Sequence, residues 1–163
     1  MNTPEILFLC TGNSCRSILA EAILNGLAQN SLHATSAGSH PAGHVHPRCV
    51  SLLQREGFPT EGLRSKSWDN LPTRPDIVLT LCDQAAGETC PAYLGPVLRA
   101  HWGVDDPARA TGTESEIEAH FDRAYRILRH RIEALLRLSV ARWLTEDPER
   151  LRTELERIGR RDP

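Results

Sequence analysis

Residues 10–17, Cys-Thr-Gly-Asn-Ser-Cys-Arg-Ser, join two segments of different hydrophobic periodicity. The run before them, residues 6–9, is continuously apolar, as in a buried strand. After them, Leu19, Ile23 and Leu27 recur at helical spacing. The sequence therefore predicts a strand, a tight loop and the beginning of a helix in immediate succession.

A loop at the beginning of a helix is suited to an oxyanion. The first backbone N–H groups of a helix have no intrahelical partner, and the helix dipole favours negative charge there. Gly12 can take a positive φ and Asn13 tolerates one, as a cradle of N–H groups requires. Arg16 adds a planar fork of donors for two oxygens of a tetrahedral anion. The residues expected to bind the substrate anion are Thr11, Gly12, Asn13, Ser14, Cys15 and Arg16.

Cys10 lies at the start of this loop, where its thiolate would be stabilised by the same field. A thiol near a helix N-terminus and an arginine can have a pKa several units below its free value of about 8.5. We therefore expect Cys10 to be a nucleophile at neutral pH. The spacing of Cys10 and Arg16 alone is also consistent with a buried structural cysteine and a surface arginine. The strand before the loop and the helix after it favour the catalytic interpretation.

Segments with strand and helix patterns alternate along the whole chain. Strands are predicted at residues 5–10, 33–36, 77–81 and 97–101, and helices at about 16–29, 47–56, 114–138 and from 148 onward. This alternation predicts an α/β fold, namely a flavodoxin-like, doubly wound, four-stranded parallel sheet in the order 2-1-3-4, with helices on both faces. We expect a catalytic domain over residues 1–140 and an amphipathic helical extension over 141–163 that packs on it.

Composition narrows the function classes. At 163 residues the chain can bury a core without disulfides or metals, and its net charge of −2 offers no basic excess for nucleic acid. No apolar stretch is long enough to cross a membrane, and no signal-peptide pattern precedes the first strand, so we expect a cytoplasmic protein. Five cysteines in a reducing compartment are more often catalytic or metal-binding than structural.

Two later cysteines extend the predicted site. Cys82 follows the strand at 77–81, and Cys90 lies eight residues further on. In the proposed sheet, Cys10 and Cys82 both follow the carboxyl ends of neighbouring parallel strands, so the fold brings Cys82 to the rim of the anion loop. A relay of three thiols then becomes possible. Alternatively, Cys82 is a small buried hydrophobe and Cys90 a chance loop residue; a zinc site is disfavoured because no matching second pair of ligands exists.

Residues 10–17 resemble the signature loop of the low-molecular-weight protein tyrosine phosphatase superfamily, and more closely the thioredoxin-coupled arsenate reductases within it. Three further stretches are similar to these reductases: Thr80-Leu-Cys82, Cys90-Pro91 and His101-Trp-Gly-Val-Asp-Asp-Pro107. The tyrosine phosphatases typically carry an aromatic residue after the Asp-Pro pair, where this chain has Ala108, and they lack the later cysteine pair. The resemblance covers residues 5–138.

The resemblance implies an arsenate reductase whose Cys10 attacks arsenate while Asp106, before Pro107, protonates the leaving oxygen. It implies that Ser17 hydrogen-bonds the Cys10 thiolate. Cys82 would then attack Cys10 to release arsenite, and Cys90 would attack Cys82, leaving a disulfide for thioredoxin or glutaredoxin. Asp105 is an adjacent alternative to Asp106, and the spacing does not choose between them. Phosphate or sulfate would bind as substrate analogues.

Two other functions remain open. A phosphatase acting on phosphotyrosine or small phosphate esters would use Cys10, Arg16 and Asp106 but neither Cys82 nor Cys90. A non-catalytic oxyanion-binding or thiol-sensing module would bind an anion without turnover. We expect no partner of nucleic acid or membrane type.

No metal or cofactor is expected, although two groups of residues are candidates. One is a histidine and cysteine cluster without a nearby carboxylate or fourth ligand: His44, His46 and Cys49. The other matches positions that some relatives use for potassium: Asn13, Glu21 and Ser36. Ser67 stands where those relatives carry an aspartate, which argues against a tight potassium site.

Overall fold

A computed structural model of the protein describes residues 3–82 and 97–161. The strands are β1 (Glu5–Leu9), β2 (His33–Ala37), β3 (Ile77–Thr80) and β4 (Leu98–His101). The α-helices are α1 (Arg16–Leu27), α2 (Pro47–Arg55), α4 (Glu114–Leu136), α5 (Val140–Glu146) and α6 (Pro148–Ile158). Two 3-10 turns, η1 (Trp68–Asn70) and η3 (Pro107–Arg109), lie between these elements. Cys90 and most of the loop predicted over 82–96 lie outside the described residues.

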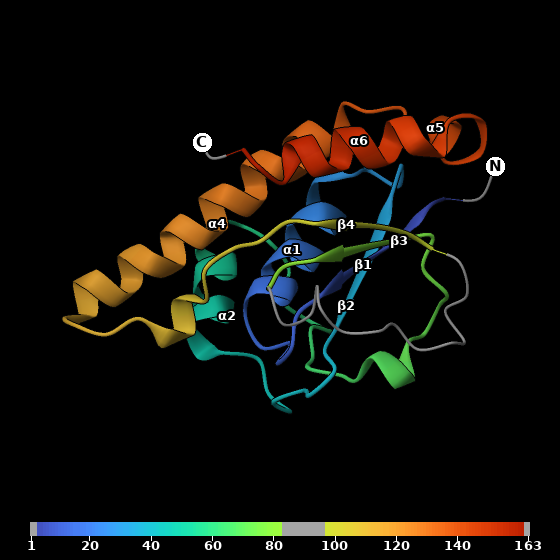
Figure 1. Cartoon of the computed structure of the whole chain (residues 1–163). Coiled ribbons are helices and arrows are strands. Elements are labelled where there is room, and N and C mark those ends of the chain that lie inside the picture. The colour runs from blue at the N-terminus through green and yellow to red at the C-terminus, as the bar shows by residue number, and fades with distance from the viewer. Residues whose placement is uncertain (1–2, 83–96, 162–163) are drawn as a thin grey trace.

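The four strands form one parallel sheet in the order β2-β1-β3-β4, which confirms the predicted topology (Figure 1). Leu9, the last residue of β1, pairs with Ala37 of β2 and Thr80 of β3. Strands β1 and β3 are therefore central neighbours that end at the same edge. The chain leaves β1 toward α1 on one side of this edge and leaves β3 at Cys82, so both cysteines follow the carboxyl ends of the strands.

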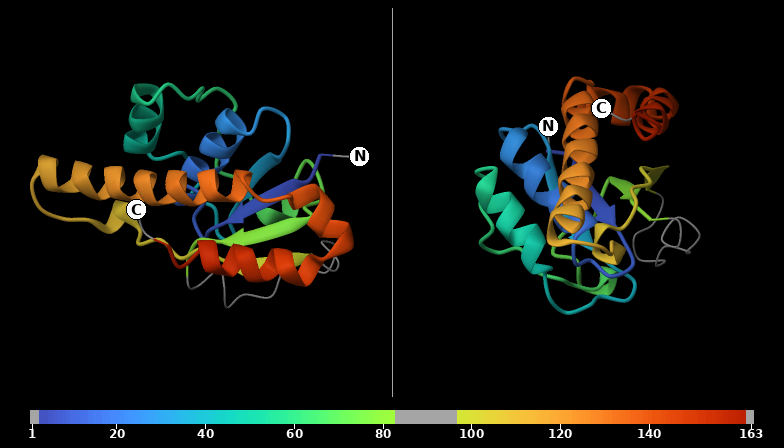
Figure 2. Two further views of the ribbon diagram at one scale, coloured as in Figure 1. Left: turned by 90° about the horizontal axis from the view of Figure 1, so that it is seen from above. Right: turned by 90° about the vertical axis from the view of Figure 1, so that its left-hand side faces the viewer.

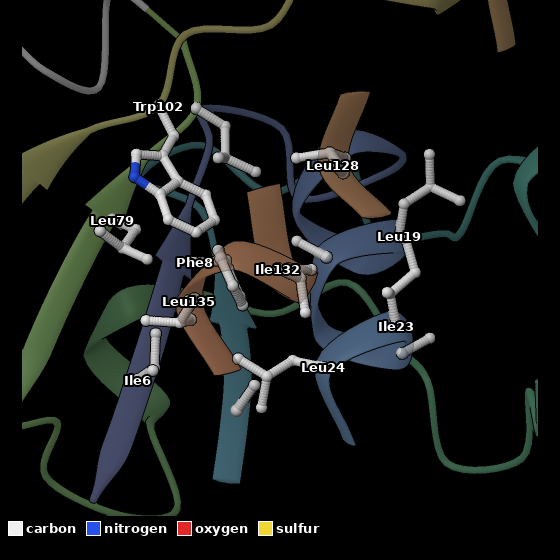
Figure 3. Close-up of a cluster of buried hydrophobic side chains, with 14 of the residues drawn as sticks. Ile6, Phe8, Leu19, Ile23, Leu24, Leu79, Trp102, Leu128, Ile132 and Leu135 are labelled. Atoms are coloured by element: carbon white, nitrogen blue, oxygen red, sulfur yellow. The ribbon is translucent and has the colours of Figure 1, made fainter. Parts of the chain in front are cut away.

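The main core lies on the face of the sheet that carries Phe8 and Leu79 (Figure 3). Side chains of α1 and α4, among them Leu19 and Ile132, are fully buried there, and Phe8 lies 6.1 Å from the Trp102 ring, centroid to centroid. Figure 2 shows α4 lying between the pair α1 and α2 on one side and α6 on the other. A smaller cluster of Leu7, Leu9, Cys10, Ala37, Val78 and Cys82 lies on the opposite face.

The helices begin where the sequence provides caps. Thr113 and Glu116 form a capping box at the start of α4, in which each side chain bonds to the other residue's backbone N–H. Pro47 occupies the first turn of α2, and the His46 ring accepts the N–H of Arg48 there. These local signals explain why the predicted helix starts agree with the structure.

The C-terminal extension contains two helices, whereas the sequence pattern predicted one from residue 148. Helix α5 was missed because it has seven residues and only Val140 is fully buried. Helix α6 packs on β4, and the Trp102 indole Nε1 donates a hydrogen bond of 2.8 Å to the Leu155 carbonyl. Among the helices of the described ranges, none has the length and apolar character needed to cross a membrane.

Candidate active site

The loop between β1 and α1 turns its carbonyls away from the sheet edge. The carbonyls of Thr11 and Gly12 accept N–H groups of His40 and Ala42 at 3.0 and 2.8 Å, and the Ser14 carbonyl is bonded in the same way from the 38–46 segment. Within the described residues, no backbone carbonyl accepts the N–H groups of residues 11–15. The Gly12 N–H is bonded to the Cys10 sulfur, and the other N–H groups are available for the anion that the sequence analysis expects at the beginning of α1.

Asn13, and not Gly12, carries the positive φ that shapes the loop, with a value of 45°. The side chain of Asn13 is fully buried and makes the compensating bonds. Its Nδ2 donates to Ser17 Oγ at 2.8 Å, and its Oδ1 accepts the Lys66 N–H at 2.8 Å. Ser17 Oγ is the acceptor of the first bond, so its hydroxyl proton stays available, and the expected bond from Ser17 to the Cys10 thiolate remains a prediction.

Gly38, directly after β2, allows the loop to approach the sheet edge. A Cβ at this position would lie 2.3 Å from the carbonyl oxygen of Thr11 and 2.8 Å from that of Cys10. Both contacts are with backbone, which cannot move aside without displacing the loop. Gly38 was not predicted from the sequence, because a glycine after a short strand gives no sign of what lies above it.

Cys10 and Cys82 lie side by side at the sheet edge. Both are buried thiols, their side chains are hydrogen-bonded, and Thr11 Oγ1 lies 3.3 Å from the Cys82 sulfur. The hydrogen bond with Cys82, followed by burial, raises the pKa of Cys10 far above its ordinary value. Arg16 and the Gly12 N–H act in the opposite direction but do not outweigh these effects. The prediction of a lowered pKa is thus wrong for this arrangement.

Arg16 connects the loop to the segment after β4. Its Nη1 donates to the Val104 carbonyl at 2.9 Å, and its Nη2 lies 3.6 Å from Asp106 Oδ2. Asp106 Oδ1 accepts the Ala108 N–H at 3.0 Å, which holds the carboxyl group at the start of η3. Asp105 is exposed, and no ion pair within the described ranges includes it. Of the two carboxylates, Asp106 is therefore the one that pairs with Arg16.

These groups surround a cavity of about 860 Å³ that opens at the carboxyl ends of β1 and β3. Its lining consists of Thr11, Gly12, Arg16, Leu81, Cys82, Gly103, Val104, Asp105, Asp106 and Arg109. Arg109, which was not predicted from the sequence, lies 3.9 Å from Asp106 and adds a second cation at the rim. A cavity with loop N–H groups, two arginines and the Cys82 thiol, which contacts the Cys10 thiol, can bind a tetrahedral oxyanion next to sulfur.

The other candidate ligands lie elsewhere. The Cys15 side chain points into the core, where its thiol contacts that of Cys49. The ring of His46 caps α2 and lies 4.9 Å from the Phe121 ring, and burial lowers its pKa. In residues 3–82 and 97–161, no three His, Cys, Asp or Glu side chains are grouped as metal ligands would be.

The residues weighed for potassium are engaged with one another. Ser36 Oγ donates to Glu21 Oε1 at 2.6 Å, and Lys66 Nζ lies 3.6 Å from the same oxygen. Ser67 Oγ accepts the Asp69 N–H at 3.1 Å and so caps η1. An ammonium group therefore stands beside Glu21 and Ser36.

Comparison with known proteins gives a consistent assignment. Residues 5–150 match the family described as low molecular weight phosphotyrosine protein phosphatase. Arsenate reductases of Bacillus subtilis strain 168 and Halalkalibacterium halodurans are 40% and 41% identical over 124 residues, which is 76% of this chain and 88% of each relative.

Solved structures agree in fold. A crystal structure of an arsenate reductase from Archaeoglobus fulgidus superposes with a TM-score of 0.66 at 26% identity, over 80% of this chain and 98% of that one. A thioredoxin-dependent arsenate reductase from Corynebacterium glutamicum has a TM-score of 0.56 at 29% identity, over 80% of this chain and 62% of that one.

Proposed function

Because the chain belongs to the low molecular weight phosphotyrosine protein phosphatase family, and its relatives above are arsenate reductases, we propose that it reduces arsenate to arsenite. The observation that carries this proposal is the contact between Cys10 and Cys82, of which Cys82 lines the anion cavity. A phosphatase needs one nucleophile, whereas reduction needs a second thiol within reach of the first.

The first step joins arsenate to Cys10. The N–H groups of residues 11–15 and the Arg16 guanidinium hold the arsenate oxygens. The Cys10 sulfur attacks arsenic, a sulfur–arsenic bond forms, and one oxygen leaves as water after taking a proton from Asp106. Attack requires the thiolate, which Arg16 and the Gly12 N–H favour and Cys82 opposes.

The second step reduces arsenic. The Cys82 thiolate attacks the Cys10 sulfur, a Cys10–Cys82 disulfide forms, and the electron pair of the broken sulfur–arsenic bond goes to arsenic. Arsenic passes from the pentavalent to the trivalent state and leaves as arsenite. We further propose that Cys90, which lies outside the described residues, attacks Cys82 and frees Cys10.

The resulting Cys82–Cys90 disulfide would be reduced by an external dithiol protein, thioredoxin or glutaredoxin. A cytoplasmic location fits this cycle, because a reducing compartment keeps the thiols ready for the next turnover. The solved relative from Corynebacterium glutamicum, which is thioredoxin-dependent, supports the first of the two reductants.

A phosphotyrosine or small-ester phosphatase is the second candidate. The family description and the Arg16–Asp106 pair favour it, since the same loop accepts phosphate and the same acid serves a leaving alkoxide. This function would leave Cys82 without a chemical role.

One pair of assays separates the two functions. NADPH consumption is followed with arsenate, thioredoxin and thioredoxin reductase, and hydrolysis of a nitrophenyl phosphate is followed separately. We expect the wild type to consume NADPH, Cys82→Ser to lose this activity but keep ester hydrolysis, and Cys90→Ser to complete about one turnover. Cys49→Ala, which removes a thiol outside the cavity, serves as the control. Ester hydrolysis without arsenate-dependent NADPH consumption by the wild type would refute the proposal.

A further inference from the structure

Lys66 is the single lysine of the chain, which carries eighteen arginines. Every other permanent side-chain cation is thus a guanidinium. An ammonium differs from a guanidinium in being compact and in pointing three donors in any direction. Only 12% of the Lys66 side chain is exposed, so the compact shape of its ammonium group affects how it fits among its neighbours.

The ammonium compensates a largely buried carboxylate behind the anion loop. Glu21 lies in α1, its side chain is 13% exposed, and its Oε1 lies 3.6 Å from Lys66 Nζ. Ser36 of β2 donates to the same oxygen at 2.6 Å. A buried carboxylate needs a partner of opposite charge to remain ionised. Lys66 is the cation that faces Glu21 among the described ion pairs.

The backbone around Lys66 holds the anion loop directly. The Lys66 N–H donates to Asn13 Oδ1 at 2.8 Å, and the Ser65 hydroxyl donates to the Gly12 carbonyl at 3.2 Å. The Lys66 carbonyl accepts the Gly38 N–H at 3.0 Å. Residues 65–66 are therefore bonded both to the two loop residues that determine its turn and to the end of β2.

We propose that Lys66 is a positioning residue for the anion loop. Its ammonium acts as a fixed internal cation that pairs with Glu21 of α1 and thereby fastens residues 65–66 against Gly12 and Asn13. Lys66 does not line the cavity, so it acts through the loop and not on the anion. The inference rests on the proposed function only in that this loop binds the substrate oxyanion.

The test compares Lys66→Met with a variant that removes both charges, Glu21→Gln/Lys66→Met. Glutamine keeps an oxygen that accepts from Ser36 while leaving no carboxylate to compensate. The control is Arg64→Met, which removes an exposed cation from the same segment. Phosphate binding to each reduced protein is measured by titration calorimetry, and unfolding by urea is measured in parallel.

We expect Lys66→Met to bind phosphate about tenfold more weakly, the double variant to recover most of that loss, and Arg64→Met to match the wild type. For arsenate, Lys66→Met should raise KM about tenfold and change kcat less than about threefold, since the loop binds but does not react. Wild-type affinity in Lys66→Met overturns the inference, as does a double variant no better than Lys66→Met. If Lys66→Met does not fold, the double variant decides: near-wild-type affinity supports the inference, and tenfold weaker binding overturns it. Phosphate binding without arsenate reduction would refute the proposed function and leave this inference standing.

Discussion

Asp106→Asn removes the negative charge and the acidic proton of one carboxyl group while keeping the size and shape of the side chain. Asp106 Oδ1 accepts the Ala108 N–H at 3.0 Å, and an asparagine Oδ1 retains this bond, so η3 should keep its position. The second oxygen, 3.6 Å from Arg16 Nη2, is replaced by an NH₂ group, which can donate a hydrogen bond but is too weak an acid to protonate a leaving oxygen. We therefore expect the variant to lose the proposed acid catalysis and to keep the fold.

The expected loss of kcat follows from the proposed acid role of Asp106 and from the exposure of its side chain to water. General acid catalysis contributes about 10²- to 10⁴-fold in rate, or roughly 2.7–5.4 kcal/mol. The Asp106 side chain is 27% exposed, so water has access to the same oxygen and supplies part of the missing proton transfer. We therefore expect kcat to fall by about 10²- to 10³-fold, in the lower half of that range. Phosphate should bind at least as tightly as to the wild type, because a negative charge beside Arg16 is removed.

Asp105→Asn is the matched control, since it changes the same functional group one residue away on an exposed side chain. Its kcat should stay within about threefold of the wild type. The kcat of nitrophenyl phosphate hydrolysis is measured for all three proteins at one pH. A larger loss in Asp105→Asn than in Asp106→Asn would show that the structure identifies the wrong carboxylate.

Three further changes test other parts of the structure. Cys82→Ala removes the largest cause of the raised Cys10 pKa, so alkylation of Cys10 by iodoacetamide should reach half its limiting rate at lower pH and should be about tenfold faster or more at neutral pH; an unchanged profile would contradict this cause. Gly38→Ala places a Cβ 2.3 Å from a loop carbonyl and should weaken phosphate binding about tenfold by calorimetry, a result that wild-type affinity would refute. Trp102→Ala should cost about 3–5 kcal/mol in urea unfolding, and the partly exposed Trp143→Ala under about 2 kcal/mol; equal losses would argue against the assigned core.

The sheet and its strand order could be predicted because the hydrophobic pattern of each strand and helix is local and recurs along the chain. Apolar runs of four or five residues, such as 77–81, alternated with helical spacings, and parallel pairing then determined which strand ends meet. The pairing of Cys10 with Cys82 could be reached in the same way, since each residue follows a strand end. Helix α5 could not, because seven residues with one fully buried side chain give no periodicity to detect.

The details of the loop depended on contacts that sequence spacing does not contain. The sequence analysis named both Gly12 and Asn13 for the positive φ, and glycine tolerates such a φ better than any other residue. The structure has the positive φ at Asn13, whose amide makes bonds to Ser17 and Lys66 that a glycine could not make. Two buried hydrogen bonds of about 1 kcal/mol each are enough to outweigh the small preference for glycine.

The pKa of Cys10 depends on tertiary contacts that the loop motif does not contain. A helix N-terminus and an arginine both favour a thiolate, and a sequence reader sees only these. Folding adds Cys82 at hydrogen-bonding distance and removes water, and both changes favour the protonated thiol. Cys82, the thiol that we propose for the reduction step, is thus also the residue that raises the pKa of Cys10 most. Reactivity of Cys10 toward an alkylating agent therefore reports whether Cys82 is in contact with it, which the anion loop alone cannot determine.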